Sequence, residues 1–289
     1  MPNDLVQQIL TVFEISLFLI GLWLTYQFLF NRSFRARWWQ ANYLPAWTAD
    51  PAEFAIYILL LFAGGVILQS VLRLWLGDFI AQAGDRQGLE IMIYGTGLDG
   101  GALLGWLLFP TLRRAWHSDY EVKSPVELTL SSPPLSWSKT SLYGAGTVAL
   151  AMPMLIALSS GWSFLLRKFG LPDAPQDSIA IFSNTKSPLV VTGMLIVACV
   201  LAPIMEEIMF RAGLYRFCRK YLGRGTSLFI SGILFGAIHA NWASFMPLAT
   251  LGIMLAAVYE TTGSIRVAII AHALFNLNSI LAILSGLTT

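Results

Sequence analysis

Long apolar stretches separated by short polar segments run along the whole chain. A helix needs roughly 20 apolar residues to cross a bilayer, and stretches of about that length recur from one end of the sequence to the other. Segments rich in proline and glycine, such as "FGLPDAPQDS" (169–178), fall between them, as is typical of connecting loops. The pattern predicts eight membrane-spanning helices, near residues 5–30, 53–76, 89–110, 139–166, 188–220, 226–241, 245–262 and 266–286.

The composition agrees with this pattern. Of the 289 residues, 56% are hydrophobic and only 12% are charged, whereas a soluble domain is closer to ~25% charged. We therefore predict an all-α fold, a polytopic membrane helix bundle. The net charge of +2 and the lack of a basic tract give no indication of a nucleic-acid partner. Cys199 and Cys218 lack the spacing of a disulfide or metal motif.

Positively charged residues gather at alternate ends of the predicted helices. They follow the first, third and fifth spans and precede the eighth. Because such residues are retained on the cytoplasmic side of a membrane, we expect both termini on the external side. Arg167 and Lys168 do not fit this scheme.

The stretch "LAPIMEEIMFR" (201–211) sets Glu206, Glu207 and Arg211 into the fifth predicted span. A charged side chain near the bilayer centre costs at least ~2.5–3.5 kcal/mol. Glu207 and Arg211 are four residues apart, so on a helix they share a face and form an ion pair. Glu206 is rotated by about 100° from Glu207, which leaves it available for chemistry.

Two histidines follow on the next predicted helices. Phe235 and His239 share one helical face in "FGAIH", and His239 is about as far from the short link near "LGRG" (222–225) as Glu206 is. In an antiparallel hairpin the two side chains would lie at one level, where a carboxylate and an imidazole can hold and deprotonate a water. His272 and Asn276, also four apart, offer two hydrogen-bond donors to a developing oxyanion.

The ordered set "EEIMFR" (206–211), "FGAIH" (235–239) and "HALFN" (272–276) resembles the CAAX protease and bacteriocin-processing family, the Abi or Rce1-like intramembrane endopeptidases. That family is marked by EExxxR, FxxxH and HxxxN on successive core helices. The resemblance predicts two parts: residues 1–170, N-terminal transmembrane helices of unknown role, and residues 187–289, an Rce1-like catalytic core.

The resemblance implies a role for each motif residue. Glu206 would be the general base on the attacking water, and His239 would help to bind that water. His272 and Asn276 would form the oxyanion hole, while Glu207, Arg211 and Phe235 would support the site. The family is a glutamate-dependent protease family without a metal cofactor. Its substrates are peptides or the C-terminal regions of prenylated proteins, met in the lipid bilayer, here expected in a prokaryotic plasma membrane.

Three other interpretations remain open at this stage. The same fold also serves as a catalytically silent scaffold or bacteriocin-immunity protein. His239, His272 and Glu206 are chemically adequate zinc ligands, although no HExxH motif is present. An ion-coupled transporter would use the other intramembrane acids, Glu14 and Asp99.

Overall fold

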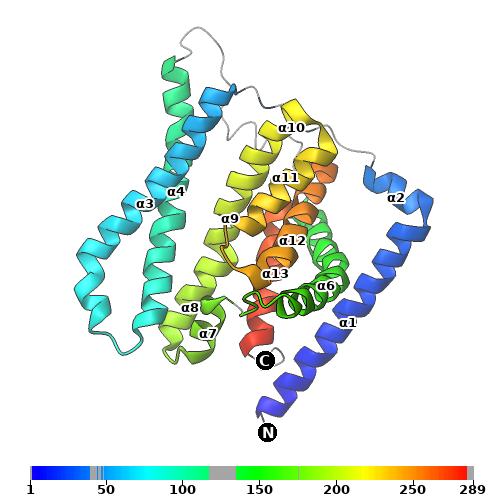
Figure 1. Ribbon diagram of the computed structural model, residues 1–289, viewed down its shortest axis with the longest axis horizontal. Helices are drawn as coiled ribbons and strands as arrows, with labels where there is room; N and C mark the ends of the chain where they lie inside the picture. Colours follow the sequence, from blue (N-terminus) through cyan, green and yellow to red (C-terminus); the bar gives the residue numbers. More distant parts are fainter. Residues whose placement is uncertain are drawn as a thin grey trace.

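The computed structural model describes residues 2–39, 44, 47, 49–116, 135–174 and 176–284 (Figure 1). These residues form helices and connecting turns without a strand, which confirms the all-α prediction. The elements, with η denoting a π-helix, are α1 (Pro2–Phe30), α2 (Arg32–Trp39), α3 (Pro51–Ala81), α4 (Arg86–Trp116), α6 (Trp137–Lys168), α7 (Asp177–Asn184), α8 (Pro188–Ile196), η1 (Val197–Leu201), α9 (Ala202–Glu207), η2 (Ile208–Tyr215), α10 (Arg216–Leu222), α11 (Arg224–Ala237), α12 (Trp242–Thr262) and α13 (Ile265–Leu284).

Within the described residues, seven helices are long and apolar enough to cross a membrane. They cover Leu5–Phe30, Pro51–Ala81, Arg86–Ala115, Trp137–Lys168, Pro188–Leu222, Trp242–Thr262 and Ile265–Leu284. Their outer faces are apolar: on α3, Leu74 and Trp75 are 83% and 81% exposed. So much exposed apolar surface suits a hydrocarbon environment and would be a liability in water. The protein is a multi-pass membrane protein.

The predicted span at 226–241 is shorter than expected. It forms α11, which has 14 residues and is therefore about 21 Å long, less than the ~30 Å hydrocarbon core. The helix ends at Ala237, and three residues later the chain turns at Ala240, which has a positive φ of 49°. Asn241 then starts α12, its side-chain oxygen accepting the Ser244 N–H at 2.9 Å. The last predicted span extends to 286, and its residues 285 and 286 lie outside the described residues.

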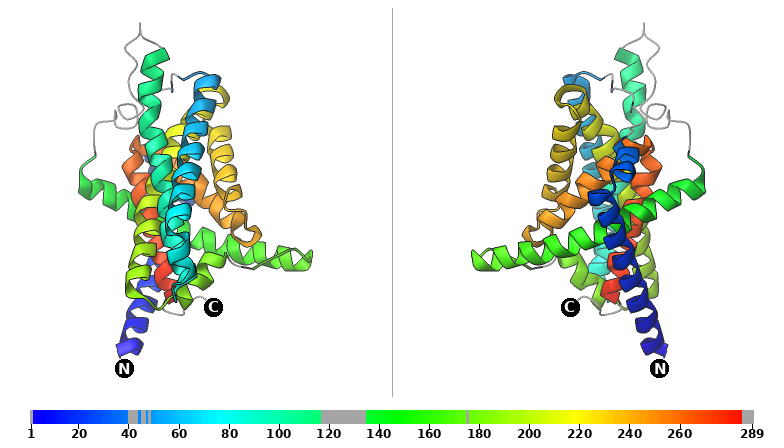
Figure 2. Two further views of the ribbon diagram at one scale, coloured as in Figure 1. Left: turned by 90° about the vertical axis from the view of Figure 1, so that its left-hand side faces the viewer. Right: turned by 90° about the vertical axis from the view of Figure 1, so that its right-hand side faces the viewer.

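The arginine-rich segments lie at one end of the bundle. In Figure 1, α2, the end of α4 and the α10–α11 turn are all found at the top. α6 is the exception to the parallel packing, because Figure 2 shows this 32-residue helix crossing the other helices at a steep angle.

The segment 188–222 is one long helix that changes register twice. The structure continues the helix through Pro203, with a π segment on each side of α9. Proline has no N–H and its ring clashes with the carbonyl four residues back in an α-helix. The wider register of η1, in which the Ala202 N–H reaches Val197 O, comes directly before the proline.

The N-terminal half contacts this helix through α3. The Tyr57 hydroxyl is buried and donates to Ile208 O at 2.9 Å. A Cβ on Gly213 would lie 2.6 Å from the Tyr57 ring, so only glycine allows this approach. Tyr57 therefore satisfies a carbonyl at the start of η2, one residue beyond Glu207.

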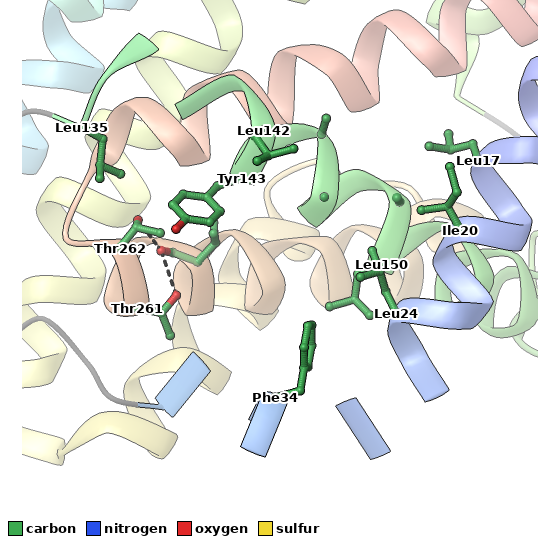
Figure 3. Close-up of a pocket in the computed structure, with 14 residues that line it drawn as sticks. Leu17, Ile20, Leu24, Phe34, Leu135, Leu142, Tyr143, Leu150, Thr261 and Thr262 are labelled. Atoms are coloured by element: carbon green, nitrogen blue, oxygen red, sulfur yellow. Dashed lines mark hydrogen bonds between the residues drawn. The ribbon is translucent and has the colours of Figure 1, made fainter. Parts of the chain in front are cut away.

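A cavity of about 720 Å³ lies between α1, α2, α6 and α12 (Figure 3). Its lining is mostly aliphatic and includes Leu17, Leu24 and Leu150. None of the predicted site residues lines it.

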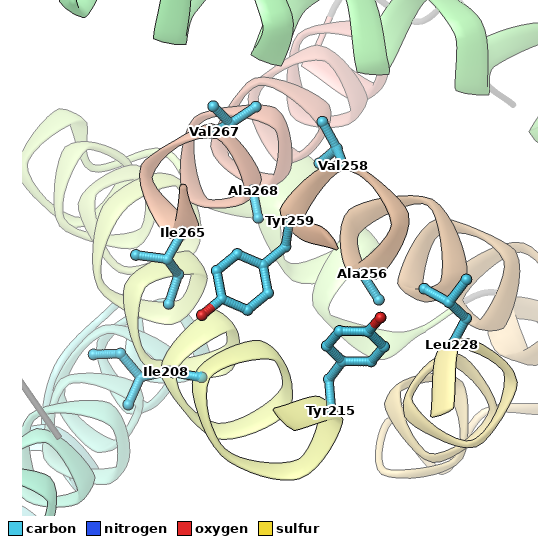
Figure 4. Close-up of a cluster of buried hydrophobic side chains, with 10 residues drawn as sticks. Ile208, Tyr215, Leu228, Ala256, Val258, Tyr259, Ile265, Val267 and Ala268 are labelled. Carbon is cyan, nitrogen blue, oxygen red and sulfur yellow. The ribbon is translucent and has the colours of Figure 1, made fainter. Parts of the chain in front are cut away.

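The C-terminal helices share a buried core near the arginine-rich end. Figure 4 shows Tyr215 of η2 and Tyr259 of α12 among aliphatic side chains from α11, α12 and α13. The Tyr215 hydroxyl donates to Glu260 at 2.7 Å, and Arg219 forms an ion pair with the same carboxylate at 3.1 Å. These contacts hold the helix that carries the two glutamates against α12.

Candidate active site

Glu206 and Glu207 end the six-residue helix α9, between the two π segments. π-helical turns lose α-helical regularity and are frequent at functional sites. Glu207 is fully buried, whereas the Glu206 side chain keeps 20% exposure. The two adjacent carboxylates therefore have different surroundings, as their spacing predicted.

Glu207 is the centre of a buried ionic cluster. Its Oε1 accepts from Arg211 Nη1 at 2.9 Å, and Arg211 Nη2 donates to Gly252 O at 2.9 Å. The Arg211 guanidinium also lies 4.6 Å from the centre of the Phe235 ring. The predicted Glu207–Arg211 pair is confirmed, and it offsets much of the cost of burying either charge.

His272 joins the two glutamates. Its Nδ1 lies 2.9 Å from Glu207 Oε1, so Nδ1–H donates to that carboxylate. This fixes the ring with Nε2 3.8 Å from Glu206 Oε2, too long for a direct hydrogen bond. The Oε2 atoms of both glutamates are buried and make no hydrogen bond within the described part of the chain.

His239 lies in the turn that follows α11, four residues after Phe235. The centre of the Phe235 ring is 5.2 Å from the His239 ring and 5.5 Å from the His272 ring. His239 Nδ1 lies 2.8 Å from Phe235 O, so its Nδ1–H donates to that carbonyl and Nε2 keeps a lone pair. The three motifs thus meet around one aromatic ring. The imidazole that lies 3.8 Å from the Glu206 carboxylate is that of His272, whereas the hairpin prediction favours His239.

Asn276 has a backbone partner that the sequence did not indicate. Its Nδ2 donates to Ala198 O at 2.8 Å. In η1 the Ala202 N–H bonds to Val197 O, and the next donor in that register would be residue 203, a proline without an N–H. Ala198 O is therefore left without a backbone donor, and Asn276 supplies one. An amide has a second N–H, which this bond does not use.

This geometry predicts that the roles of Asn276 and Pro203 are coupled. Asn276→Leu should lower the free energy of unfolding by about 1–3 kcal/mol, the cost of an unsatisfied buried carbonyl. With Pro203→Ala in place, the new N–H at position 203 can bond to Ala198 O, so the same change should cost clearly less. Thermal unfolding of the four proteins in detergent measures this coupling.

Ser279→Ala provides the matched control on α13. The Ser279 hydroxyl donates only to Phe275 O within its own helix, at 3.0 Å, so its effect should not depend on residue 203. Equal costs for Asn276→Leu in both backgrounds would contradict the assignment.

Asp99 adds a third acid to this region. It lies on α4, is partly buried, and interacts electrostatically with Glu206. From the sequence, Asp99 is only a candidate acid of an ion-coupled transporter. α4 packs against α3 through glycines, since a Cβ on Gly101 would lie 2.2 Å from Gly64 O. The sequence does show acids within separate predicted spans. It does not show how far apart these spans lie, so the proximity of Asp99 to Glu206 could not be predicted.

The zinc alternative needs three converging ligands. No group of three or more His, Cys, Asp or Glu side chains that could hold a metal ion occurs among the residues the structure describes. In particular, His239, His272 and Glu206 do not form such a group.

Comparison with known proteins identifies the same region. Residues 188–278 match the family model described as "Type II CAAX prenyl endopeptidase Rce1-like". The chain is also 31% identical over 109 residues to the "Putative membrane peptidase YdiL" of Bacillus subtilis (strain 168). That match covers 37% of this chain and 43% of the relative, so it spans less than half of either protein. No solved structure matches the chain. The resemblance drawn from the three motifs is confirmed for residues 188–278, which match the Rce1-like family model.

Proposed function

We propose that this protein is an intramembrane endopeptidase that cleaves a peptide or a lipidated protein near its C-terminus, with Glu206 as the base. The observation that carries the proposal is the arrangement of Glu206, His272 and Glu207. One partly exposed carboxylate lies 3.8 Å from an imidazole nitrogen, and a buried carboxylate fixes that imidazole from behind.

The first step is the activation of a water. Glu206 Oε2 and His272 Nε2 lie 3.8 Å apart and do not hydrogen-bond to each other, so we assign the catalytic water to a place beside both groups, where it contacts each of them. Glu206 accepts a proton from this water as its oxygen attacks the peptide carbonyl carbon. The accepting Nε2 of His239 would hold the second hydrogen, and its position across the Phe235 ring from His272 supports that role.

The second step is the stabilisation of the oxyanion. In its imidazolium form His272 has an N–H at Nε2 as well as the one at Nδ1 that Glu207 accepts. This N–H and the second N–H of Asn276 are the donors that we assign to the oxyanion hole. The C–N bond then breaks as Glu206 returns the first water proton to the leaving nitrogen. The second water proton passes from the new carboxyl group to the amine, so that a carboxylate and an ammonium group result. No metal takes part in this scheme.

Hydrolysis in H₂¹⁸O tests the proposal. Protein reconstituted in vesicles is supplied with C-terminal CAAX-type peptides, farnesylated and unmodified. We expect cleavage with one ¹⁸O in the new carboxylate, unchanged after chelation of divalent metals and lost in Glu206→Gln. Cleavage that needs a metal, or that persists in Glu206→Gln, would contradict the mechanism.

For location, we propose a prokaryotic plasma membrane. The seven span-length helices and the bacterial origin of the relative support it.

A further inference from the structure

The cavity beside α6 differs in polarity from one end to the other. Figure 3 shows Leu17 and Ile20 at one end and Thr261, Thr262 and Tyr143 at the other. Both threonine hydroxyls donate to carbonyls of their own helix, so these two donors need no partner from a ligand. A volume of about 720 Å³ lies within the ~300–1,000 Å³ range of ligand sites. An apolar end and a more polar end are the features expected of a site for an amphiphile, a molecule with an apolar tail and a polar headgroup.

α2 places positive charge at the edge of this cavity. Phe34 contributes to the lining, and Arg32 and Arg35 flank it in sequence. Arg35 Nη1 donates to Phe28 O and Leu29 O at 3.1 and 2.7 Å, which fixes α2 at the end of α1. Arg32 is exposed. α2 contains no acid and lies at the arginine-rich end of the bundle (Figure 1).

From these features we infer that the cavity binds one acyl chain of an anionic membrane phospholipid, whose phosphate lies beside Arg32 and Arg35 of α2. The apolar lining alone would not select a lipid, because lipid tails are as apolar as leucine. Selection comes from charge: the leaflet facing positive loops carries anionic lipid, and each arginine near its surface contributes about 1 kcal/mol. The inference does not depend on the proposed chemistry.

α6 connects this cavity with the active site. Ala149 and Leu150 line the cavity, while Val148 and Ala151 pack in the cluster that contains Phe235. One face of α6 therefore lines the cavity, and the adjacent face packs in the cluster that contains Phe235. A bound acyl chain would pack against the cavity-lining face of α6, beside the face that contacts the Phe235 cluster.

Gly146→Leu tests the inference by filling the cavity. A Cβ at Gly146 would meet no atom within 4 Å, so the new side chain enters the cavity without a backbone clash. Gly161→Leu is the matched control, because Gly161 lies on the same helix, also has open space around its Cβ, and does not line the cavity. Both changes remove a helical glycine, so their effects on helix propensity cancel.

The measurement is native mass spectrometry of purified protein titrated with phosphatidylglycerol or phosphatidylcholine. We expect one tightly bound phosphatidylglycerol on the unaltered protein and on Gly161→Leu, with at least tenfold weaker binding to Gly146→Leu. Arg32→Gln should lower the preference for phosphatidylglycerol about fivefold, which corresponds to about 1 kcal/mol. Ala145→Leu, also in the lining, replaces Gly146→Leu if that variant does not fold.

Two results would overturn the inference. One is equal phosphatidylglycerol binding by Gly146→Leu and Gly161→Leu. The other is displacement of the bound phosphatidylglycerol by a farnesylated peptide at equal concentration, which would assign the cavity to the substrate.

Discussion

Glu206→Gln is expected to reduce peptide cleavage by about 10²–10⁴-fold, the usual contribution of a general base, without lowering the thermal stability. Glutamine has nearly the same shape but cannot accept the proton of the water. Glu206 is the partly exposed member of the pair and its Oε2 makes no hydrogen bond within the described residues, so few native contacts are lost. Initial rates and melting curves of the purified protein measure the two effects.

Two other substitutions make this result interpretable. Glu207→Gln should lower stability as well as activity, because it leaves Arg211 buried beside a neutral partner. Glu90→Gln changes a glutamate of the surface pair with Arg86 and should leave cleavage unchanged. Cleavage by Glu206→Gln at the normal rate would contradict the role of Glu206 as the base. A Glu206→Gln protein that supports the cellular role without cleavage would favour the scaffold interpretation over the protease interpretation.

Arg211→Met is expected to destabilise the protein by about 3–5 kcal/mol, because it leaves the Glu207 charge buried and unpaired. Both side chains of this pair are 0% exposed, so water cannot replace the lost partner. Glu207→Gln/Arg211→Met removes both charges and should recover most of this loss. The free energy of unfolding in mixed micelles, compared across the two single variants and the double variant, gives the coupling.

Arg167→Met is the control for loss of an arginine. The Arg167–Asp173 pair is largely exposed, at 63% and 37%, and such pairs contribute about 0–1 kcal/mol. A loss in Arg211→Met no larger than in Arg167→Met would mean that Glu207 is solvated in the membrane, and the buried cluster would have to be reconsidered.

Local patterns predicted much of this fold. Apolar stretches of the right length gave the long helices, and the i, i+4 spacing gave the Glu207–Arg211 pair. The end of α11 was missed because the turn after Ala237, with a positive φ at Ala240, carries no glycine or proline that would mark it in the sequence. Sequence therefore predicted elements and contacts within one helix more successfully than where each helix ends.

Contacts between helices were harder to predict. The hairpin prediction compared how far Glu206 and His239 lie along their helices from the connecting link. This distance does not fix the direction in which a side chain points around the helix axis. Each π segment adds one residue to its turn and rotates everything after it relative to an α-helical wheel. Two such segments flank Glu206 and Glu207, so faces assigned across 197–215 with a period of 3.6 could not identify His272 as the neighbour of both glutamates.

The hydrogen bond from Tyr57 to Ile208 has a consequence for attempts to isolate the motif-bearing region. Expressed alone, residues 187–289 would lack the phenol that covers Gly213 and would present a bare peptide carbonyl to lipid next to Glu207. A chimera that joins this segment to the N-terminal helices of a relative would need an equivalent donor at that depth. We therefore expect a segment that begins before α3 to fold more readily than residues 187–289 alone.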